Sequence, residues 1–140
     1  MKREITSSLD ELSNVVEYIQ KVVPKSAIIF LDGDLASGKT TLTKEIAKYR
    51  GLEDEVTSPT FSLQQCYGGK LYHYDLYRID YNEFMELGLF EEFDREGWHI
   101  VEWGSDKLKE FLLNAGYTLF NITITPISES KRKYIIEKIQ

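Results

Sequence analysis

Apolar residues recur along this chain at two different spacings, which separate the predicted helices from the predicted strands. Over residues 9–23 they recur every three or four positions, which predicts an amphipathic helix that ends before Pro24. The unbroken apolar run within residues 26–32 is typical of a strand buried on both faces of a parallel sheet. A second helix is expected over residues 39–49, with Gly51 just beyond its end.

The rest of the chain carries shorter segments separated by turn residues. Residues 61–67 and 71–77 are rich in β-forming side chains and flank Gly68-Gly69, which predicts a β-hairpin. The other expected elements are a helix over residues 82–87, a solvated helix or loop over 91–96, a buried strand over 98–103, a helix from Ser105 to Asn114, and edge strands over 117–125 and 133–139. Together these elements predict a three-layer α/β fold with a mixed, mostly parallel sheet and a β-hairpin.

Length and composition narrow the class of protein. A chain of 140 residues has room for one domain with a core of its own, so we expect residues 1–140 to form a single domain. The formal net charge of −6 argues against unspecific binding to nucleic-acid backbones. The single cysteine, Cys66, excludes an intrachain disulfide and a cysteine-based metal site. With no apolar run of membrane-spanning length, we expect a cytoplasmic protein without membrane contact.

The clearest candidate chemistry follows the first predicted strand. Residues 33–40 fit the pattern G-x-x-x-x-G-K-[ST] of a phosphate-binding loop, placed between a strand and a helix. In such a loop the backbone N–H groups converge on a phosphate, Lys39 reaches the β- and γ-phosphates, and the Thr40 hydroxyl can ligate Mg²⁺. The residues expected to contact the nucleotide are Gly33, Asp34, Leu35, Ala36, Ser37, Gly38, Lys39, Thr40 and Thr41. The alternative is a glycine-rich turn without a ligand. No guanine-specifying Asn-Lys-x-Asp is present, which favours ATP and ADP as the nucleotides.

Two carboxylates are candidates for the chemistry at that nucleotide. Glu102 ends an apolar strand, where an acid can hold Mg²⁺ or polarise the attacking water, although a surface glutamate is the alternative. Asp75 shares one face of its strand with His73, and it is either an active-site acid or an edge-strand residue facing water. A structural role is favoured for His73 over a metal-ligating one. Trp103 is expected to pack, or to gate a partner, more than to stack on a base.

Hydroxyl residues between the phosphate loop and these acids form a candidate switch. In nucleotide switches, side chains such as Thr57, Ser58 and Thr60 sense the γ-phosphate or its Mg²⁺. An ordinary turn at Ser58-Pro59 is an equal alternative. The tyrosines that crowd the predicted hairpin favour cross-strand packing or a protein interface over base stacking.

Four segments together resemble the TsaE (YjeE) family, the ATPases of bacterial tRNA threonylcarbamoyladenosine formation. They are residues 33–41, residues 57–61, the His-Tyr-Asp-Leu-Tyr-Arg of residues 73–78 and the Val-Glu-Trp-Gly of residues 101–104. The resemblance extends from the first helix to about residue 125. One departure is Ala36, where family members usually carry glycine, and which is expected to strain the loop if a left-handed conformation is needed there.

This resemblance implies a P-loop NTPase-like domain that binds ATP and Mg²⁺ and hydrolyses ATP slowly when alone. It implies TsaB and TsaD as partners, the pair that transfers a threonylcarbamoyl group to the adenosine next to the tRNA anticodon, so that tRNA is contacted only indirectly. It also implies catalytic roles for Lys39, Asp75 and Glu102, Mg²⁺ ligation by Thr40 and Glu102, and a hydrolytic or switch role for Thr60. Residues 6–8 and Arg132 are expected near the adenine.

Two other functions are alternatives. A small P-loop kinase would need a lid with several arginines, whereas the five arginines of this chain are scattered. A module that binds RNA through its tyrosine-rich hairpin would not need the phosphate loop at all.

Overall fold

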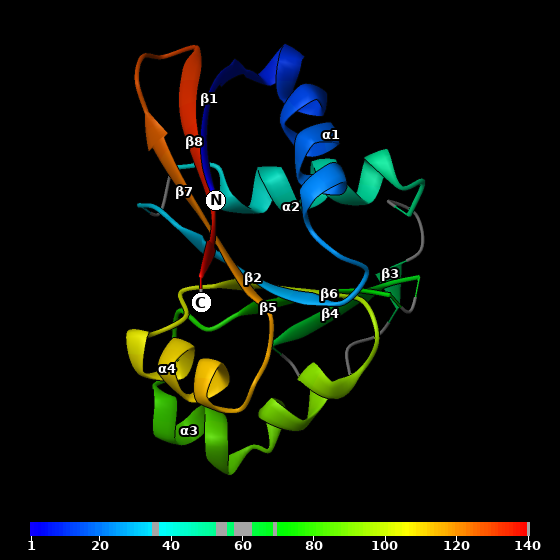
Figure 1. The fold of residues 1–140 in the computed structure, drawn as a ribbon, viewed down its shortest axis with the longest axis vertical. Coiled ribbons are helices and arrows are strands. Elements are labelled where there is room, and N and C mark those ends of the chain that lie inside the picture. The colour runs from blue at the N-terminus through cyan, green and yellow to red at the C-terminus, as the bar shows by residue number, and fades with distance from the viewer. Residues whose placement is uncertain (35–36, 53–55, 58–62, 69, 140) are drawn as a thin grey trace.

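The computed structural model describes residues 1–34, 37–52, 56–57, 63–68 and 70–139. Within these residues the strands are β1 Lys2–Ser8, β2 Ala27–Asp32, β3 Val56–Thr57, β4 Gln64–Tyr67, β5 Leu71–Asp75, β6 Trp98–Glu102, β7 Leu119–Pro126 and β8 Lys131–Ile139. The helices are α1 Leu12–Val22, α2 Lys39–Tyr49, α3 Tyr81–Glu86 and α4 Asp106–Asn114, and the 3-10 turns are η1 Leu9–Glu11 and η2 Leu89–Asp94. The strands form a single sheet in the order β1-β8-β7-β2-β6-β5-β4-β3 (Figure 1).

The centre of the sheet is parallel and positions the candidate site. Strands β7, β2, β6 and β5 run in the same direction. In the register, Leu31 of β2 lies beside Glu102 of β6, and Glu102 lies beside Asp75 of β5. Because parallel strands end at the same edge of a sheet, the phosphate loop and both candidate acids meet at one edge.

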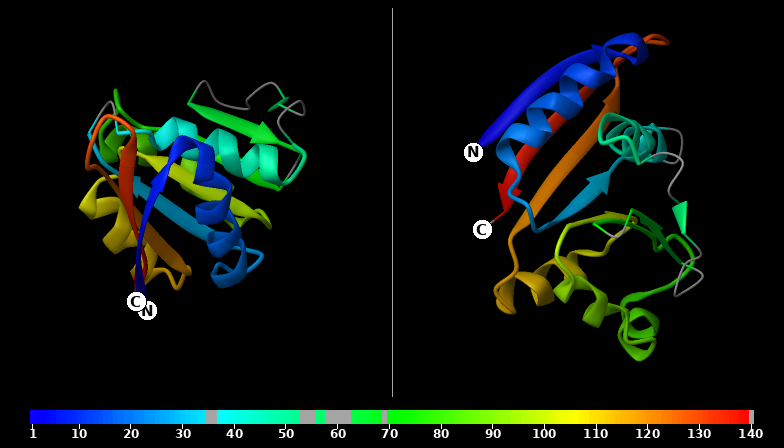
Figure 2. Two further views of the ribbon diagram at one scale, coloured as in Figure 1. Left: turned by 90° about the horizontal axis from the view of Figure 1, so that it is seen from above. Right: turned by 90° about the vertical axis from the view of Figure 1, so that its right-hand side faces the viewer.

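Helices cover both faces of this sheet, as Figures 1 and 2 show. Alternate residues of β2 point to opposite faces, so that Ile29 and Leu31 pack in the core under α1 and α2. Ile28 and Phe30 pack in the other core, with side chains of α3, η2 and α4. The predicted three-layer α/β fold with a buried central strand is therefore confirmed.

The predicted edge strands 117–125 and 133–139 are strands, but neither lies at an edge. β7 pairs with β2 and β8, and β8 pairs on its other side with β1, which was not predicted. β1 was missed because Ile5 is the one large apolar residue in its polar sequence, and most of its residues are exposed. The sheet is mixed, as predicted. It is less parallel than predicted, because among the described residues three strand pairings are parallel, whereas four (β7–β8, β8–β1, β5–β4 and β4–β3) are antiparallel.

The local elements otherwise follow the expectations, with small shifts. The hairpin of β4 and β5 is confirmed, and Gly68 adopts a φ of +63° in its turn. The first helix begins with η1 and becomes α-helical at Leu12. Residues 91–94 of the charged segment belong to η2, which buries Leu89 and Phe93 while Glu91 and Asp94 are exposed. No helix in the described part of the chain is long and apolar enough to span a membrane.

Candidate nucleotide-binding site

The phosphate loop connects β2 to α2 and is closed by two glycines. A Cβ atom on Gly33 would lie 2.5 Å from the Ser37 hydroxyl oxygen and 2.8 Å from the carbonyl oxygen of Ile124, so a side chain does not fit there. Gly38 has a φ of +105°, a conformation that glycine adopts without strain, immediately before α2. The Ser37 hydroxyl is buried and has no hydrogen-bond partner among the described residues. A buried hydroxyl without a partner is a suitable donor for an oxygen-rich ligand.

Lys39 lies at the centre of the site with its side chain folded back onto the protein. Its ammonium group donates a hydrogen bond of 2.7 Å to the Gly33 carbonyl and lies 3.5 Å from the centre of the Trp103 ring. Burial lowers the pKa of Lys39 from its usual value, while the nearby carboxylates of Glu102 and Asp32 oppose this shift. The ammonium group of Lys39 is therefore bound to the Gly33 carbonyl and packed on the Trp103 ring. It must leave both contacts to reach a phosphate.

Glu102 is buried and is held by two residues from different elements. The Thr40 hydroxyl at the start of α2 donates to its Oε2 at 3.0 Å, and His73 Nε2 of β5 lies 2.5 Å from the same oxygen. Burial raises the pKa of Glu102, but His73, Thr40 and the charge of Lys39 outweigh this effect and hold the pKa below its usual value. The structure thus brings together Thr40 and Glu102, the two residues predicted to ligate Mg²⁺.

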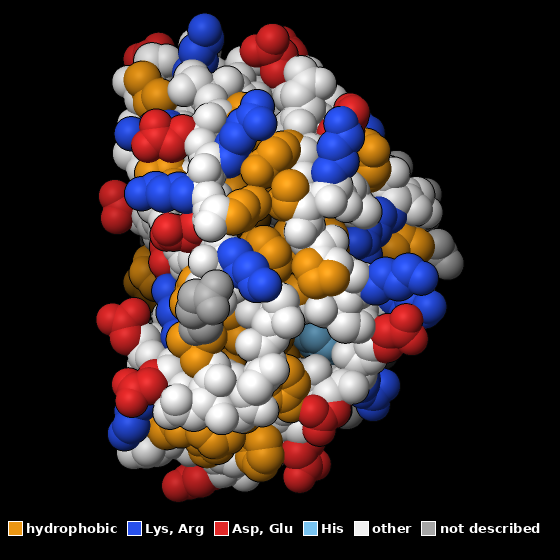
Figure 3. Space-filling view, viewed as in Figure 1, with side chains coloured by type: hydrophobic (Ala, Val, Ile, Leu, Met, Phe, Trp, Pro, Cys, Tyr) orange, Lys and Arg blue, Asp and Glu red, His pale blue; other side chains and the backbone are white. Residues whose placement is uncertain are grey.

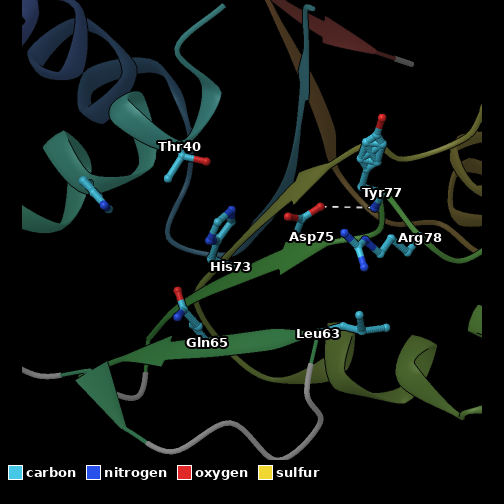
Figure 4. Close-up of a pocket in the computed structure, with 8 residues that line it drawn as sticks. Thr40, Leu63, Gln65, His73, Asp75, Tyr77 and Arg78 are labelled. Carbon is cyan, nitrogen blue, oxygen red and sulfur yellow. Dashed lines mark hydrogen bonds between the residues drawn. The ribbon is translucent and has the colours of Figure 1, made fainter. Parts of the chain in front are cut away.

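Asp75 ends β5 at the mouth of the site and is exposed. Its Oδ1 accepts a hydrogen bond of 3.1 Å from the backbone N–H of Tyr77. A cavity of about 840 Å³ separates α2 from the hairpin, and its lining includes Thr40, Lys44, His73 and Asp75. Figure 4 shows Thr40 facing this space from α2, and His73 and Asp75 facing it from β5. Asp75 thus faces water, but β5 is an inner strand between β6 and β4 and not the edge strand of one interpretation. Its role as an active-site acid stays a prediction.

Trp103 follows Glu102 and has a φ of +62°, which is strained for a residue with a side chain. Its ring lies 4.9 Å from the Tyr77 ring, and about a third of the residue (37%) is exposed. It therefore packs against neighbours, as predicted, and also covers the lysine of the phosphate loop.

Some predicted residues lie outside the described part of the chain. Leu35 and Ala36 of the phosphate loop and Ser58 and Thr60 of the candidate switch are among them, so neither the proposed strain at Ala36 nor the switch is tested. Thr57 belongs to β3 and pairs in register with Cys66. Asp34 accepts a backbone hydrogen bond of 2.9 Å from Ser37, and Thr41 is exposed in the first turn of α2.

Two contacts of the site were not predicted from the sequence. His73 was interpreted as structural, although its shared face with Asp75 already indicated that it could reach the same edge. Arg132 of β8, which the resemblance implied near the adenine, donates from Nε to the Ser37 carbonyl at 2.6 Å, a contact that ties the phosphate loop to a strand 95 positions later in the sequence. Ser7 lies opposite Arg132 in the β1–β8 register, so residues 6–8 lie beside the strand segment that contacts the loop. No sequence pattern reveals such a contact, because it depends on the unpredicted strand order.

No group of three or more His, Cys, Asp and Glu side chains that could hold a metal occurs among the described residues. The predicted Mg²⁺ site does not require such a group, because Mg²⁺ is commonly held by one or two protein oxygens together with phosphate oxygens and water.

The sheet order, the glycine-rich strand-to-helix loop and the acid on the neighbouring strand define a P-loop-type α/β domain. Comparison with known proteins identifies the family within this class. The family model described as threonylcarbamoyl adenosine biosynthesis protein TsaE matches residues 6–134, and the chain belongs to this family.

Individual relatives agree with this assignment. The tRNA threonylcarbamoyladenosine biosynthesis protein TsaE of Aquifex aeolicus is 37% identical over 142 residues, which cover 95% of this chain and 93% of that protein. The protein of the same name from Rickettsia typhi is 34% identical over 137 residues, with coverages of 94% and 92%. The crystal structure of Bacillus subtilis YdiB has a TM-score of 0.69 and 25% sequence identity to this chain, and the match covers 100% of this chain and 88% of YdiB. The resemblance derived from the sequence motifs is thereby confirmed, and the chain belongs to a family named for threonylcarbamoyladenosine biosynthesis.

Proposed function

We propose that this chain is a Mg²⁺-dependent ATP-binding protein with weak intrinsic ATPase activity, which supports TsaB and TsaD in forming threonylcarbamoyladenosine next to the tRNA anticodon. The observation that carries the proposal is the pairing of Thr40 with Glu102 at 3.0 Å beside the ammonium group of Lys39. A hydroxyl, a carboxylate and a lysine at the end of a glycine-rich loop are the groups that a Mg²⁺–nucleotide requires.

The residues present fit both ligands. The absence of a side chain at Gly33 lets the chain pack closely against Ser37 at the start of the loop, and the Ser37 hydroxyl, which has no partner among the described residues, is a donor for phosphate oxygens. Thr40 and Glu102 would hold Mg²⁺, which when bound neutralises developing charge on the phosphate oxygens. His73 would keep the Glu102 carboxylate ionised and fixed in orientation.

Lys39 and Asp75 would act on the nucleotide and on water. Lys39 would exchange the Gly33 carbonyl for the β- and γ-phosphates as the nucleotide enters. Asp75 is the exposed carboxylate that lines the cavity, so it is the candidate to orient the attacking water or accept its proton. In this proposal Glu102 ligates the metal ion, and Asp75 orients the attacking water.

ATP hydrolysis by the purified chain, alone and with TsaB and TsaD from the same source, tests the proposal. We expect slow hydrolysis that needs Mg²⁺, and a different rate when TsaB and TsaD are added. An unchanged rate would contradict the partner role, and hydrolysis without Mg²⁺ would contradict the metal role. Phosphate transfer that depends on an added hydroxyl compound would support the alternative of a small kinase instead.

A further inference from the structure

A second cluster of charged side chains lies at the opposite edge of the sheet, where β2 and β6 begin. A cavity of about 270 Å³ is lined there by three cations, Lys25, Arg50 and Lys70, and by one carboxylate, Glu96. Figure 3 shows Lys and Arg side chains at the right-hand side of the molecule, where Figure 1 places the chain entering β2. This local excess of positive charge contrasts with the formal net charge of −6 for the whole chain.

Arg50 is fixed in place at this cavity by two contacts. Its Nε donates to Oε1 of Gln20 at 2.7 Å, and its guanidinium carbon lies 3.9 Å from the centre of the Trp98 ring. The Trp98 ring is itself rigidly held, because the residue is fully buried and its indole N–H donates to the Pro24 carbonyl at 2.7 Å. The guanidinium is therefore oriented before any ligand arrives, which reduces the entropy lost on binding.

The charge of Arg50 lacks a counter-ion in the described part of the chain. The ion pairs found there do not include Arg50, and burial lowers the pKa of its guanidinium from the usual value. Glu96 pairs with Lys70 at 3.9 Å, and both side chains are well exposed, which makes this ion pair weak. Apart from Nε, the N–H donors of this half-buried guanidinium have no partner among the described residues. Such a group beside two lysines is a site for an anion with several acceptor oxygens.

We propose that this cavity binds a phosphate group, through the guanidinium of Arg50 and the ammonium groups of Lys25 and Lys70. A phosphate near neutral pH carries a charge of about −1.5 to −2, which matches the three cations less the one carboxylate. A purely structural role of Arg50 would account for its packing on Trp98. It would not account for the two lysines that line the same cavity. The phosphate is either free or part of an RNA backbone, where each phosphodiester carries one negative charge, and both sources offer acceptor oxygens to the same donors. The proposal does not depend on nucleotide binding at the phosphate loop.

Two NMR signals report on the cavity directly: the Nε–H of Arg50 and the indole N–H of Trp98. The titration uses the full-length Lys39→Ala variant, so that the phosphate loop does not compete for the probe. Inorganic phosphate is added first, and a short unstructured RNA is added to a second sample. We expect saturable shifts of both signals with at least one probe. Shifts with RNA at lower concentration than with phosphate would identify the backbone as the source, and shifts with phosphate alone would identify free phosphate.

Variants separate binding from a purely structural role of Arg50. Arg50→Gln is expected to weaken binding about tenfold or more, measured on the Trp98 signal. Lys70→Gln leaves the stacked pair intact and is expected to weaken binding about threefold, so the test does not depend on Arg50→Gln remaining folded. The control is Lys131→Gln, an exposed lysine at the start of β8 with the same change of charge. Absence of saturable shifts with both probes, or equal affinities of the Lys70→Gln and Lys131→Gln proteins, would overturn the proposal.

Discussion

The two edges of the parallel strands differ in how positive charge is supplied. At the carboxyl edge, the charges of Glu102 and Asp75 act on the buried ammonium group of Lys39, and Lys44 and Arg78 line the same cavity. At the amino edge, three cations (Lys25, Arg50 and Lys70) line a cavity together with one carboxylate, Glu96. The carboxyl edge does not depend on cationic side chains alone, because the loop backbone and the N-terminus of α2 also supply positive potential for phosphate. Its carboxylates are then available for a metal and for water, whereas an anion site at the amino edge depends on side chains alone.

Replacement of Lys39 is the strongest way to break this contrast. Lys39→Ala removes the cation that faces Glu102 at the carboxyl edge, and we expect ATP hydrolysis to fall by about 100-fold or more. Steady-state release of phosphate measures the effect. Lys48→Ala, an exposed lysine near the end of the same helix, is the matched control and should keep the wild-type rate. Equal rates for the two variants would remove Lys39 from the catalytic machinery.

Replacement of His73 tests whether Glu102 is held as described. His73→Asn removes a contact of 2.5 Å to a buried carboxylate, so the free energy of unfolding should fall by about 1–3 kcal/mol at pH 7. Because the pKa of Glu102 is lowered in the folded chain, this stabilisation is present above the unfolded pKa of about 4.3 and is lost as the pH falls through the folded value.

Urea unfolding at pH 7 and at acidic pH measures this effect, and the wild-type advantage should shrink in acid. The control is the double variant His73→Asn, Glu102→Gln. If His73 acts through Glu102, replacing it in the Glu102→Gln background should cost much less stability. An undiminished loss in that background would show that His73 stabilises the chain by another contact.

A smaller effect is expected where β8 supports the phosphate loop. Arg132→Gln removes the hydrogen bond to the Ser37 carbonyl, and nucleotide affinity should fall about three- to tenfold. Lys131→Gln changes the neighbouring charge without touching the loop and serves as the control. Calorimetric titration with Mg²⁺–ADP distinguishes the two variants. Identical affinities would mean that the strand pairing, and not the arginine, keeps the loop in place.

The smallest effect on hydrolysis is expected at the amino edge. Arg50→Gln should leave the rate of ATP hydrolysis within about twofold of wild type, because Arg50 lies outside the nucleotide site and distant sites act independently. The same phosphate-release assay checks this. A large loss of activity in a folded Arg50→Gln protein would mean that the two edges of the sheet are coupled.

The sequence predicted those parts of the fold and site that depend on local pattern. The helix over residues 39–49, the hairpin and the Ser105 cap of α4 all follow from spacing and capping chemistry, and each is present. The meeting of Lys39, Thr40 and Glu102 could also be expected, because parallel strands end at one edge. The phosphate-loop motif therefore predicted the position of the loop itself and also the acid that lies beside it.

Contacts that depend on strand order could not be predicted in this way. β1 has too few apolar residues to show a strand periodicity. Because β1 pairs with β8, the predicted edge strand β8 lies inside the sheet. The contact of Arg132 with the loop follows from that arrangement. The position of Lys39 under Trp103 depends on the left-handed backbone of a tryptophan, which the sequence does not indicate.

The central claim is that Lys39, Thr40 and Glu102 form one Mg²⁺–nucleotide site. Its most direct test is the affinity for ADP measured with and without Mg²⁺, in the wild-type chain and in Glu102→Gln. We expect Mg²⁺ to strengthen binding about tenfold or more in the wild type and to have little effect in the variant. The same affinity in all four measurements would contradict the claim.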